Sequence, residues 1–94
     1  MSEELKTSVE TYLSNAKPLF SGLKAVKPAS LDGALKLAEE AKTMALAYYE
    51  DALHFQEKGE YARALAALEY AEGWLDAGVR LGYLKTTSKR DGVL

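Results

Sequence analysis

The sequence predicts an all-α protein, a three-helix bundle in which a kinked first helix packs on a long central helix that forms an antiparallel hairpin with the third. Three observations predict this fold. Apolar residues recur every three or four positions over most of the chain, which is the period of an amphipathic helix. Two breaks interrupt the pattern, VKPAS at residues 26–30 and Gly59. The chain has 94 residues, the size of one domain with a single core.

The first helix is expected over about residues 3–25. Its apolar face consists of residues spaced by three and four positions: Leu5, Val9, Tyr12, Ala16, Leu19, Leu23 and Val26. Pro18 interrupts this helix, because it lacks the amide hydrogen that would bond to the carbonyl of Ser14, a loss of about 3 kcal/mol in a helix interior. Since the apolar face resumes in phase after Pro18, one kinked helix is predicted, with two shorter helices as the alternative.

The second helix is predicted over about residues 31–58 and is the central element. Its inner face alternates steps of three and four residues, and alanine predominates there: Leu31, Ala34, Ala38, Ala41, Ala45, Tyr48, Ala52 and Phe55. Side chains this small would let a neighbouring helix approach closely. Gly59 is expected to end the helix in the left-handed conformation, and Glu60 then begins the third helix.

The third helix contains ALEYAEGWLDAG, residues 67–78, which holds the only tryptophan. Gly73 in mid-helix costs roughly 1 kcal/mol relative to alanine, so it needs a reason. Packing supplies one if Trp74 is buried against the second helix, near Tyr48 or Ala52, with Gly73 close to another backbone. The alternative is an interaction surface on this helix. Its members would be Tyr70, Gly73, Trp74 and Asp76.

Composition excludes several classes of site. The chain has no cysteine, so it forms neither a disulfide nor a thiolate zinc site. His54 is the only histidine, and although Asp51 lies three residues before it, a di-iron bundle site needs two histidines and four carboxylates. No serine–histidine–acid order, glycine-rich phosphate loop or zinc spacing is present. We therefore predict a protein that is not an enzyme, with no catalytic, cofactor-binding or metal-ligating residues.

Charge is distributed unevenly along the chain, whose net charge is −2. Residues 31–59 carry three basic and six acidic groups, which argues against a groove that binds phosphates. The last ten residues, KTTSKRDGVL, carry three basic groups and one acidic group. They show no helical periodicity and follow an expected helix stop at Gly82. We predict one folded domain over residues 1–84 and a flexible tail over 85–94.

Targeting signals are not evident in the sequence. The start, MSEELKTSVE, is polar and acidic, unlike a signal peptide. No run of about 18 apolar residues could span a membrane. A cytoplasmic protein without a membrane span is therefore expected.

Residues 47–82 hold a distinctive set of aromatic, small and acidic positions. They are Tyr49, Asp51, Ala52, Phe55, Gly59, Tyr61, Ala64, Tyr70, Ala71, Gly73, Trp74, Asp76 and Gly78. This set resembles the core of the archaeal family called domain of unknown function 357. The resemblance implies a compact three-helix protein and an archaeal source, and it implies no reaction, cofactor or catalytic residue, because the family has no established activity.

The turn between the second and third helices has a second, local resemblance. The motif G-x-Y-x-x-A-L, from Gly59 to Leu65, resembles the turn of a tetratricopeptide hairpin. No second copy appears at a period of about 34 residues, and the preceding helix is too long. The motif therefore predicts one helical hairpin, not a repeat array.

The leading functional hypothesis is a non-enzymatic module for protein–protein interaction or self-association, with a homodimer as the simplest oligomer. Exposed tyrosines and strips of small residues are the kind of surface that accepts a helix or a second copy. One alternative is a nucleic-acid-binding accessory protein that uses the basic tail, with tyrosine or tryptophan stacking on bases. Another is an enzyme or metal-binding protein. Its ligands would come from Asp51, His54, Glu69, Glu72 and Asp76.

Overall fold

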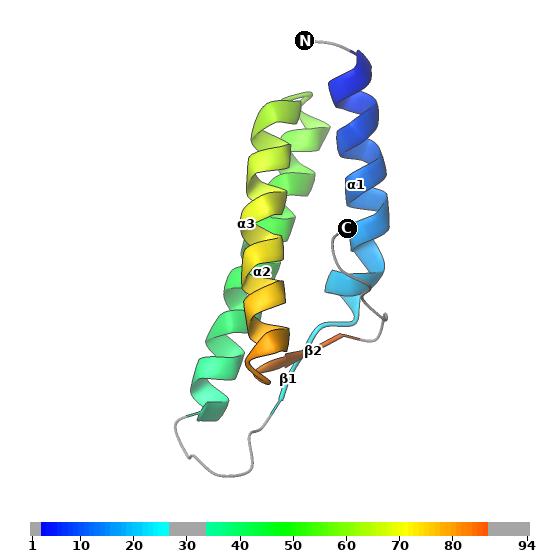
Figure 1. Ribbon diagram of the computed structural model, residues 1–94. Helices are drawn as coiled ribbons and strands as arrows, with labels where there is room; N and C mark the ends of the chain where they lie inside the picture. The colour runs from blue at the N-terminus through cyan, green and yellow to red at the C-terminus, as the bar shows by residue number, and fades with distance from the viewer. Residues whose placement is uncertain (1–2, 27–33, 87–94) are drawn as a thin grey trace.

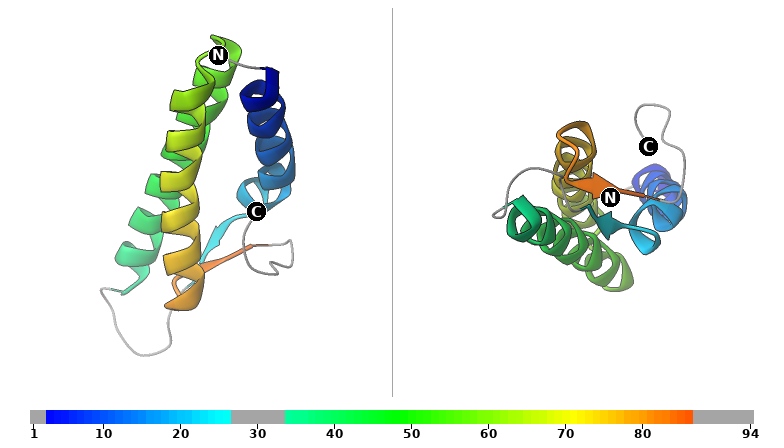
Figure 2. Two further views of the ribbon diagram at one scale, coloured as in Figure 1. Left: turned by 45° about the horizontal axis from the view of Figure 1, so that its top comes forward. Right: turned by 90° about the horizontal axis from the view of Figure 1, so that it is seen from below.

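The computed structural model describes residues 3–26 and 34–86, which form a helical bundle with a small sheet at one end (Figure 1). In chain order the described elements are α1 (Glu3–Ser21), β1 (Lys24–Ala25), α2 (Ala34–Glu57), α3 (Tyr61–Arg80) and β2 (Leu84–Lys85). Helices α2 and α3 lie side by side and run antiparallel, and α1 packs along one side of the pair (Figure 2). The predicted all-α three-helix bundle is confirmed.

Helix α1 is one continuous helix that includes Pro18 in its last turn. The Pro18 carbonyl accepts a hydrogen bond from the Gly22 amide at 3.3 Å and another from the Ser21 hydroxyl at 3.5 Å, and these bonds close the end of the helix. The alternative of two shorter helices is therefore wrong. The predicted end at residue 25 is also wrong, because the chain leaves the helix after Ser21 to form β1.

The α2–α3 hairpin turns at Gly59, whose φ of +76° confirms the predicted left-handed conformation. The Glu60 amide donates to the Phe55 carbonyl at 2.9 Å, and the Gly59 amide donates to the Gln56 carbonyl at 3.0 Å. These two bonds form a Schellman motif, which satisfies carbonyls that the helix end leaves without partners. Helix α3 ends in the same way at Gly82, where φ is +81°, so the predicted stop there is confirmed.

Replacing Gly59 with valine is expected to lower the free energy of unfolding by more than about 1 kcal/mol, because a β-branched residue is strained at positive φ. Space does not limit this position, since a Cβ on Gly59 would meet no atom within 4 Å. Asparagine tolerates the left-handed conformation, so Gly59→Asn is the control and should lose less. Urea denaturation measures the free energy of unfolding of both variants. If both lose the same amount, strain at positive φ is not the cause.

Small residues line the seam between α2 and α3. The buried ones are Ala38, Ala41, Ala45 and Ala52 on α2, and Ala64, Ala67, Ala71 and Gly78 on α3. Side chains of this size let two helix axes approach closely. Tyr48 and Phe55, which the sequence placed on the inner face of α2, are only half-buried at the edge of the seam, and Tyr49 is buried instead.

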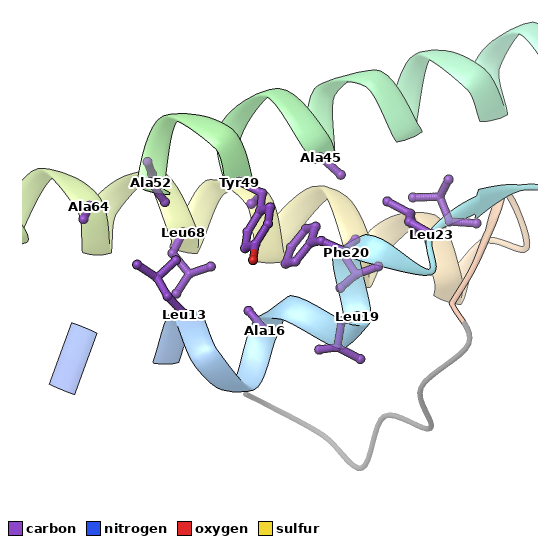
Figure 3. Packing of buried hydrophobic residues seen from close by; sticks show 14 of the residues in the cluster. Leu13, Ala16, Leu19, Phe20, Leu23, Ala45, Tyr49, Ala52, Ala64 and Leu68 are labelled. Carbon is purple, nitrogen blue, oxygen red and sulfur yellow. The ribbon is translucent and has the colours of Figure 1, made fainter. Parts of the chain in front are cut away.

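The core lies between α1 and the hairpin (Figure 3). Its largest fully buried side chains are Phe20, Leu68, Leu75 and Val9. The Phe20 ring of α1 stacks on the Tyr49 ring of α2, with centroids 4.5 Å apart and planes 7° from parallel. The hairpin therefore covers the apolar face of α1, and within residues 3–26 and 34–86 no further helix packs on the face of the hairpin away from α1.

Burial raises the pKa of the Tyr49 phenol above its ordinary value. Because its pKa in the folded state exceeds that in the unfolded chain, the stabilisation is fully present below about pH 10 and is lost as the pH rises through the folded-state pKa. We expect the melting temperature of the wild type to fall more steeply above about pH 10 than that of Tyr49→Phe. Thermal melts followed by circular dichroism give the melting temperature of each protein as a function of pH. If the two curves are parallel above about pH 10, ionisation of Tyr49 does not affect stability.

A two-stranded sheet joins the segment after α1 to the segment after α3. Lys24 pairs with Lys85 and Ala25 with Leu84 in antiparallel register. The Thr86 hydroxyl also donates a hydrogen bond of 2.7 Å to the carbonyl of Leu19. The folded chain therefore extends through at least Thr86, past the predicted boundary after residue 84. The rest of the predicted tail, residues 87–94, lies outside the described residues.

Candidate interaction surface

Trp74 is not enclosed between the helices, and Gly73 has no close neighbour of the kind that was predicted. The Trp74 side chain is 38% exposed, and a Cβ on Gly73 would meet nothing within 4 Å. The prediction that Gly73 lies close to another backbone is therefore wrong, and Trp74, which was predicted to be mostly buried near Tyr48 or Ala52, is exposed over more than a third of its surface. The physical reason is that the small residues of α3 occupy the seam, which turns the bulky ones outward.

The close approach that the sequence assigned to Gly73 occurs instead at Gly78. A Cβ on Gly78 would collide with the side chain of Leu84, which is buried where β2 passes the end of α3. Gly78 also accepts a hydrogen bond of 2.8 Å at its carbonyl from the Tyr83 amide. The glycine of α3 that packing requires is therefore Gly78, in the last turn of the helix, and not Gly73.

Large apolar side chains gather on the face of the hairpin away from α1. Five such side chains are exposed in the part of the chain that the structure describes, and four of them belong to the hairpin: Leu37 on α2, Tyr70 and Trp74 on α3, and Leu81 at the C-cap of α3. On α3, residues 70, 74 and 81 follow one line with Ala66 and Ala77, at steps of three and four residues. On α2, Leu37 continues the line of Met44 and Tyr48 by steps of seven and four residues.

We call this surface the open face, formed by the two lines of side chains on α2 and α3. It consists of Leu37, Met44, Tyr48, Asp51 and Phe55 of α2, and Arg63, Ala66, Tyr70, Trp74, Ala77 and Leu81 of α3. Helix α1 packs on the opposite side of the hairpin, through contacts that include Phe20 with Tyr49 (Figure 3). The fifth exposed apolar residue, Tyr12, lies on α1 and outside this face.

Two aromatic rings stack across the helices near the middle of the open face. The centroids of Tyr48 and Tyr70 are 5.2 Å apart, and their planes differ by 26°. The two tyrosines border an open hollow of about 250 Å³ that extends toward the Gly59 turn. At its end the Arg63 guanidinium lies 6.0 Å from the centre of the Phe55 ring and pairs with Glu60 at 3.1 Å. The hollow is therefore apolar in the middle and charged at the turn.

The structure divides the four residues that the sequence proposed as an interaction surface. Tyr70 and Trp74 lie on the open face, and Gly73 is exposed at its edge. Asp76 follows Trp74 by two residues, which places it on the other side of α3, where it forms an ion pair of 3.3 Å with Arg80. Sequence reasoning missed Leu37 and Leu81. The signal that could have revealed them is the helical spacing, because Leu37 is in line with Tyr48 on α2 and Leu81 is in line with Trp74 on α3.

The residues proposed as metal ligands do not converge in the described part of the chain. Asp51 and His54 are both exposed on α2, and the His54 ring lies beside the Phe55 ring, with centroids 6.4 Å apart. Within residues 3–26 and 34–86, no group of three histidine, aspartate or glutamate side chains could hold a metal ion. In the same residues, no helix has the length and hydropathy of a membrane span.

Trp74→Ala is expected to lower the free energy of unfolding by less than the roughly 3–5 kcal/mol that removal of a fully buried aromatic residue costs. The reason is that much of the indole already contacts water. The neighbouring Leu75 is fully buried, so Leu75→Ala is a matched control and should lose about 2–5 kcal/mol. Urea denaturation compares the two, and equal losses would mean that Trp74 belongs to the core.

Comparison with known proteins places the chain in a family. The sequence model described as "Protein of unknown function (DUF357)" matches residues 11–84, and so extends the resemblance beyond residues 47–82 into α1. The fold is similar to the crystal structure of protein AF1782 from Archaeoglobus fulgidus, which carries the same family description, with a TM-score of 0.69 and 25% sequence identity. That alignment covers 90% of this chain and 96% of the other. No curated protein matches the sequence. Because the family match spans most of the chain, the protein belongs to the DUF357 family.

Proposed function

We propose that this protein is a non-enzymatic docking module that binds another protein through the open face. The observation that carries the proposal is the gathering of Leu37, Tyr70, Trp74 and Leu81 on one side of the hairpin. Single exposed apolar residues are ordinary on a protein surface, whereas a contiguous apolar patch marks an interaction site. A core that needed these side chains would have enclosed them, as it encloses Phe20 and Leu75.

The composition of the open face supports this proposal. Its α3 line carries no charged residue from Ala66 to Leu81, while Asp51 and Arg63 lie toward the turn. Protein interfaces are enriched in tyrosine, tryptophan, methionine and arginine, and their charges lie at the rim. Tryptophan, tyrosine and arginine also contribute most of the binding energy where it has been measured. The open face has this composition and this arrangement.

Affinity capture with matched variants tests the proposal. The tagged wild type, the double variant Tyr70→Glu/Leu81→Glu and the control Tyr12→Glu are compared in lysate of the source organism. Each of the three replaced residues is exposed, so circular dichroism should show that all variants fold. We expect a partner that the wild type and the control retain and that the double variant loses.

The captured protein is then purified, and its dissociation constants for the three forms are measured by titration calorimetry. The double variant should bind at least about tenfold more weakly than the control. If every captured protein binds the double variant as tightly as the wild type, the open face is not the docking surface.

A further inference from the structure

We propose that the occupant of the open face is a second copy of this chain, so that two α2–α3 hairpins pack face to face in a four-helix homodimer. This inference rests on the proposed function, since it names the partner for the same surface. Three properties of the open face support it: its size, the placement of its charges and the order of its large and small side chains.

The open face has the area that a stable dimer needs. Helix α3 contains 20 residues. At 1.5 Å per residue it is about 30 Å long, and two adjacent helices are about 20 Å wide. The face therefore covers about 600 Å² on each copy and about 1,200 Å² in total, at the lower end of the range for stable interfaces. A small partner seated in the hollow beside Tyr48 and Tyr70 would leave Leu37 and Leu81 in water. The hairpin of a second copy has the length and width to cover them.

Two residues of opposite charge, Glu40 and Lys58, lie on either side of Tyr48 at the border of the open face. Glu40 lies on α2 eight residues before Tyr48, and Lys58 follows Tyr48 by ten residues, directly after the end of α2. Two faces that pack symmetrically are related by a two-fold axis in the plane of contact. An axis that crosses the helices at the level of Tyr48 turns one hairpin end for end over the other. Glu40 of one copy then approaches Lys58 of the other.

Large and small side chains alternate along α3 in an order that fits the same symmetry. Trp74 follows Tyr70 by four residues, and Ala66 precedes Tyr70 by four residues. Tyr48 and Tyr70 stack at the same level, so the two-fold axis also passes near Tyr70. The symmetry therefore places Trp74 of one copy over Ala66 of the other. A large ring that meets a methyl-sized side chain is the complementarity that helix packing requires.

Sedimentation velocity and tryptophan fluorescence test the homodimer together. Trp74 is the only tryptophan, so fluorescence excited selectively at tryptophan reports on the open face. With rising concentration we expect the mass to double from 10.3 kDa. Over the same range the emission should shift to shorter wavelength, and acrylamide should quench it less. Tyr70→Glu should raise the dimer dissociation constant at least about tenfold, and the control Tyr12→Glu should not.

A charge exchange tests the end-for-end arrangement. Glu40→Lys and Lys58→Glu should each weaken the dimer, and the double variant should recover part of the loss, because each copy then presents the reversed pair. If the loss of dimer affinity in the double variant equals the sum of the losses in the two single variants, this arrangement is wrong.

Two outcomes would overturn the homodimer itself. One is a monomer mass at all concentrations up to about 1 mM, which corresponds to less than about 4 kcal/mol of binding free energy. The other is a dimer that Tyr70→Glu leaves intact, since it would use another surface. Neither outcome decides the proposed docking function, because the capture experiment measures partners other than a second copy. A heterologous partner lost with Tyr70→Glu/Leu81→Glu would then identify the occupant.

Discussion

Replacing Phe20 with alanine is expected to lower the free energy of unfolding by about 3–5 kcal/mol, as the loss of a buried aromatic ring does. Phe20 is 2% exposed and stacks on Tyr49 between α1 and the hairpin. Its removal leaves a cavity at the contact that attaches α1. The backbones of α2 and α3 lie much closer to each other than to that of α1, so α1 is attached to the hairpin mainly through its buried side chains. Urea denaturation followed by circular dichroism measures the loss.

Two further variants separate the effect of the cavity from other effects of the substitution. Phe20→Leu fills part of the space and should lose less than Phe20→Ala. Tyr12 is an exposed aromatic residue on the same helix, so Tyr12→Ala should lose less than about 1 kcal/mol. If Phe20→Ala and Tyr12→Ala cost the same, the Phe20 ring does not hold α1 on the hairpin.

Gly78→Ala is expected to destabilise the protein by about 1–3 kcal/mol, although alanine is the better helix former. The added Cβ would overlap the end of the Leu84 side chain and lie 3.1 Å from its Cβ. Leu84 is 3% exposed and pairs with Ala25 in the sheet, so it cannot move away without disturbing β2. Overpacking at this point therefore outweighs the gain in helix propensity.

Gly73→Ala is the matched control, because Gly73 lies in the same helix and a Cβ there meets no atom within 4 Å. It should stabilise the protein by up to about 1 kcal/mol through helix propensity alone. The bulkier Gly73→Leu should likewise be tolerated, because Gly73 has no close neighbour. Thermal and urea denaturation show whether each alanine substitution raises or lowers the free energy of unfolding. A change in the same direction for both would refute the contact between Gly78 and Leu84.

Periodicity predicted the helices and the hairpin because these elements carry their signals within short stretches of sequence. The alanine line of α2 repeats every three or four residues, and Gly59 marks the helix end by its own conformational preference. The strands carry no such signal. Each has two residues, and Lys24 and Lys85 are partners only because the helices bring them together. Sequence reasoning therefore assigned residues 24–25 to a helix.

The candidate surface was harder to predict than the fold because two stripes of apolar residues overlap on α3. One stripe includes Ala64, Ala71 and Gly78, and the other includes Tyr70 and Trp74. Periodicity shows that both stripes exist and does not show which of them faces α2. The bulk of tryptophan suggested burial, whereas close approach of the helices selects the small residues for the seam.

The β1–β2 pair has a consequence for the order in which the protein folds. It joins Lys24 to Lys85, which are 61 residues apart in the sequence, whereas the α2–α3 hairpin closes through the short turn at Gly59. Loop-closure entropy rises with the length of the loop, so local contacts form before distant ones. The hairpin is therefore the element that forms early, and α1 docks afterwards together with the sheet. We therefore expect hydrogen exchange to show an opening that releases α1 together with the sheet and leaves the α2–α3 hairpin closed.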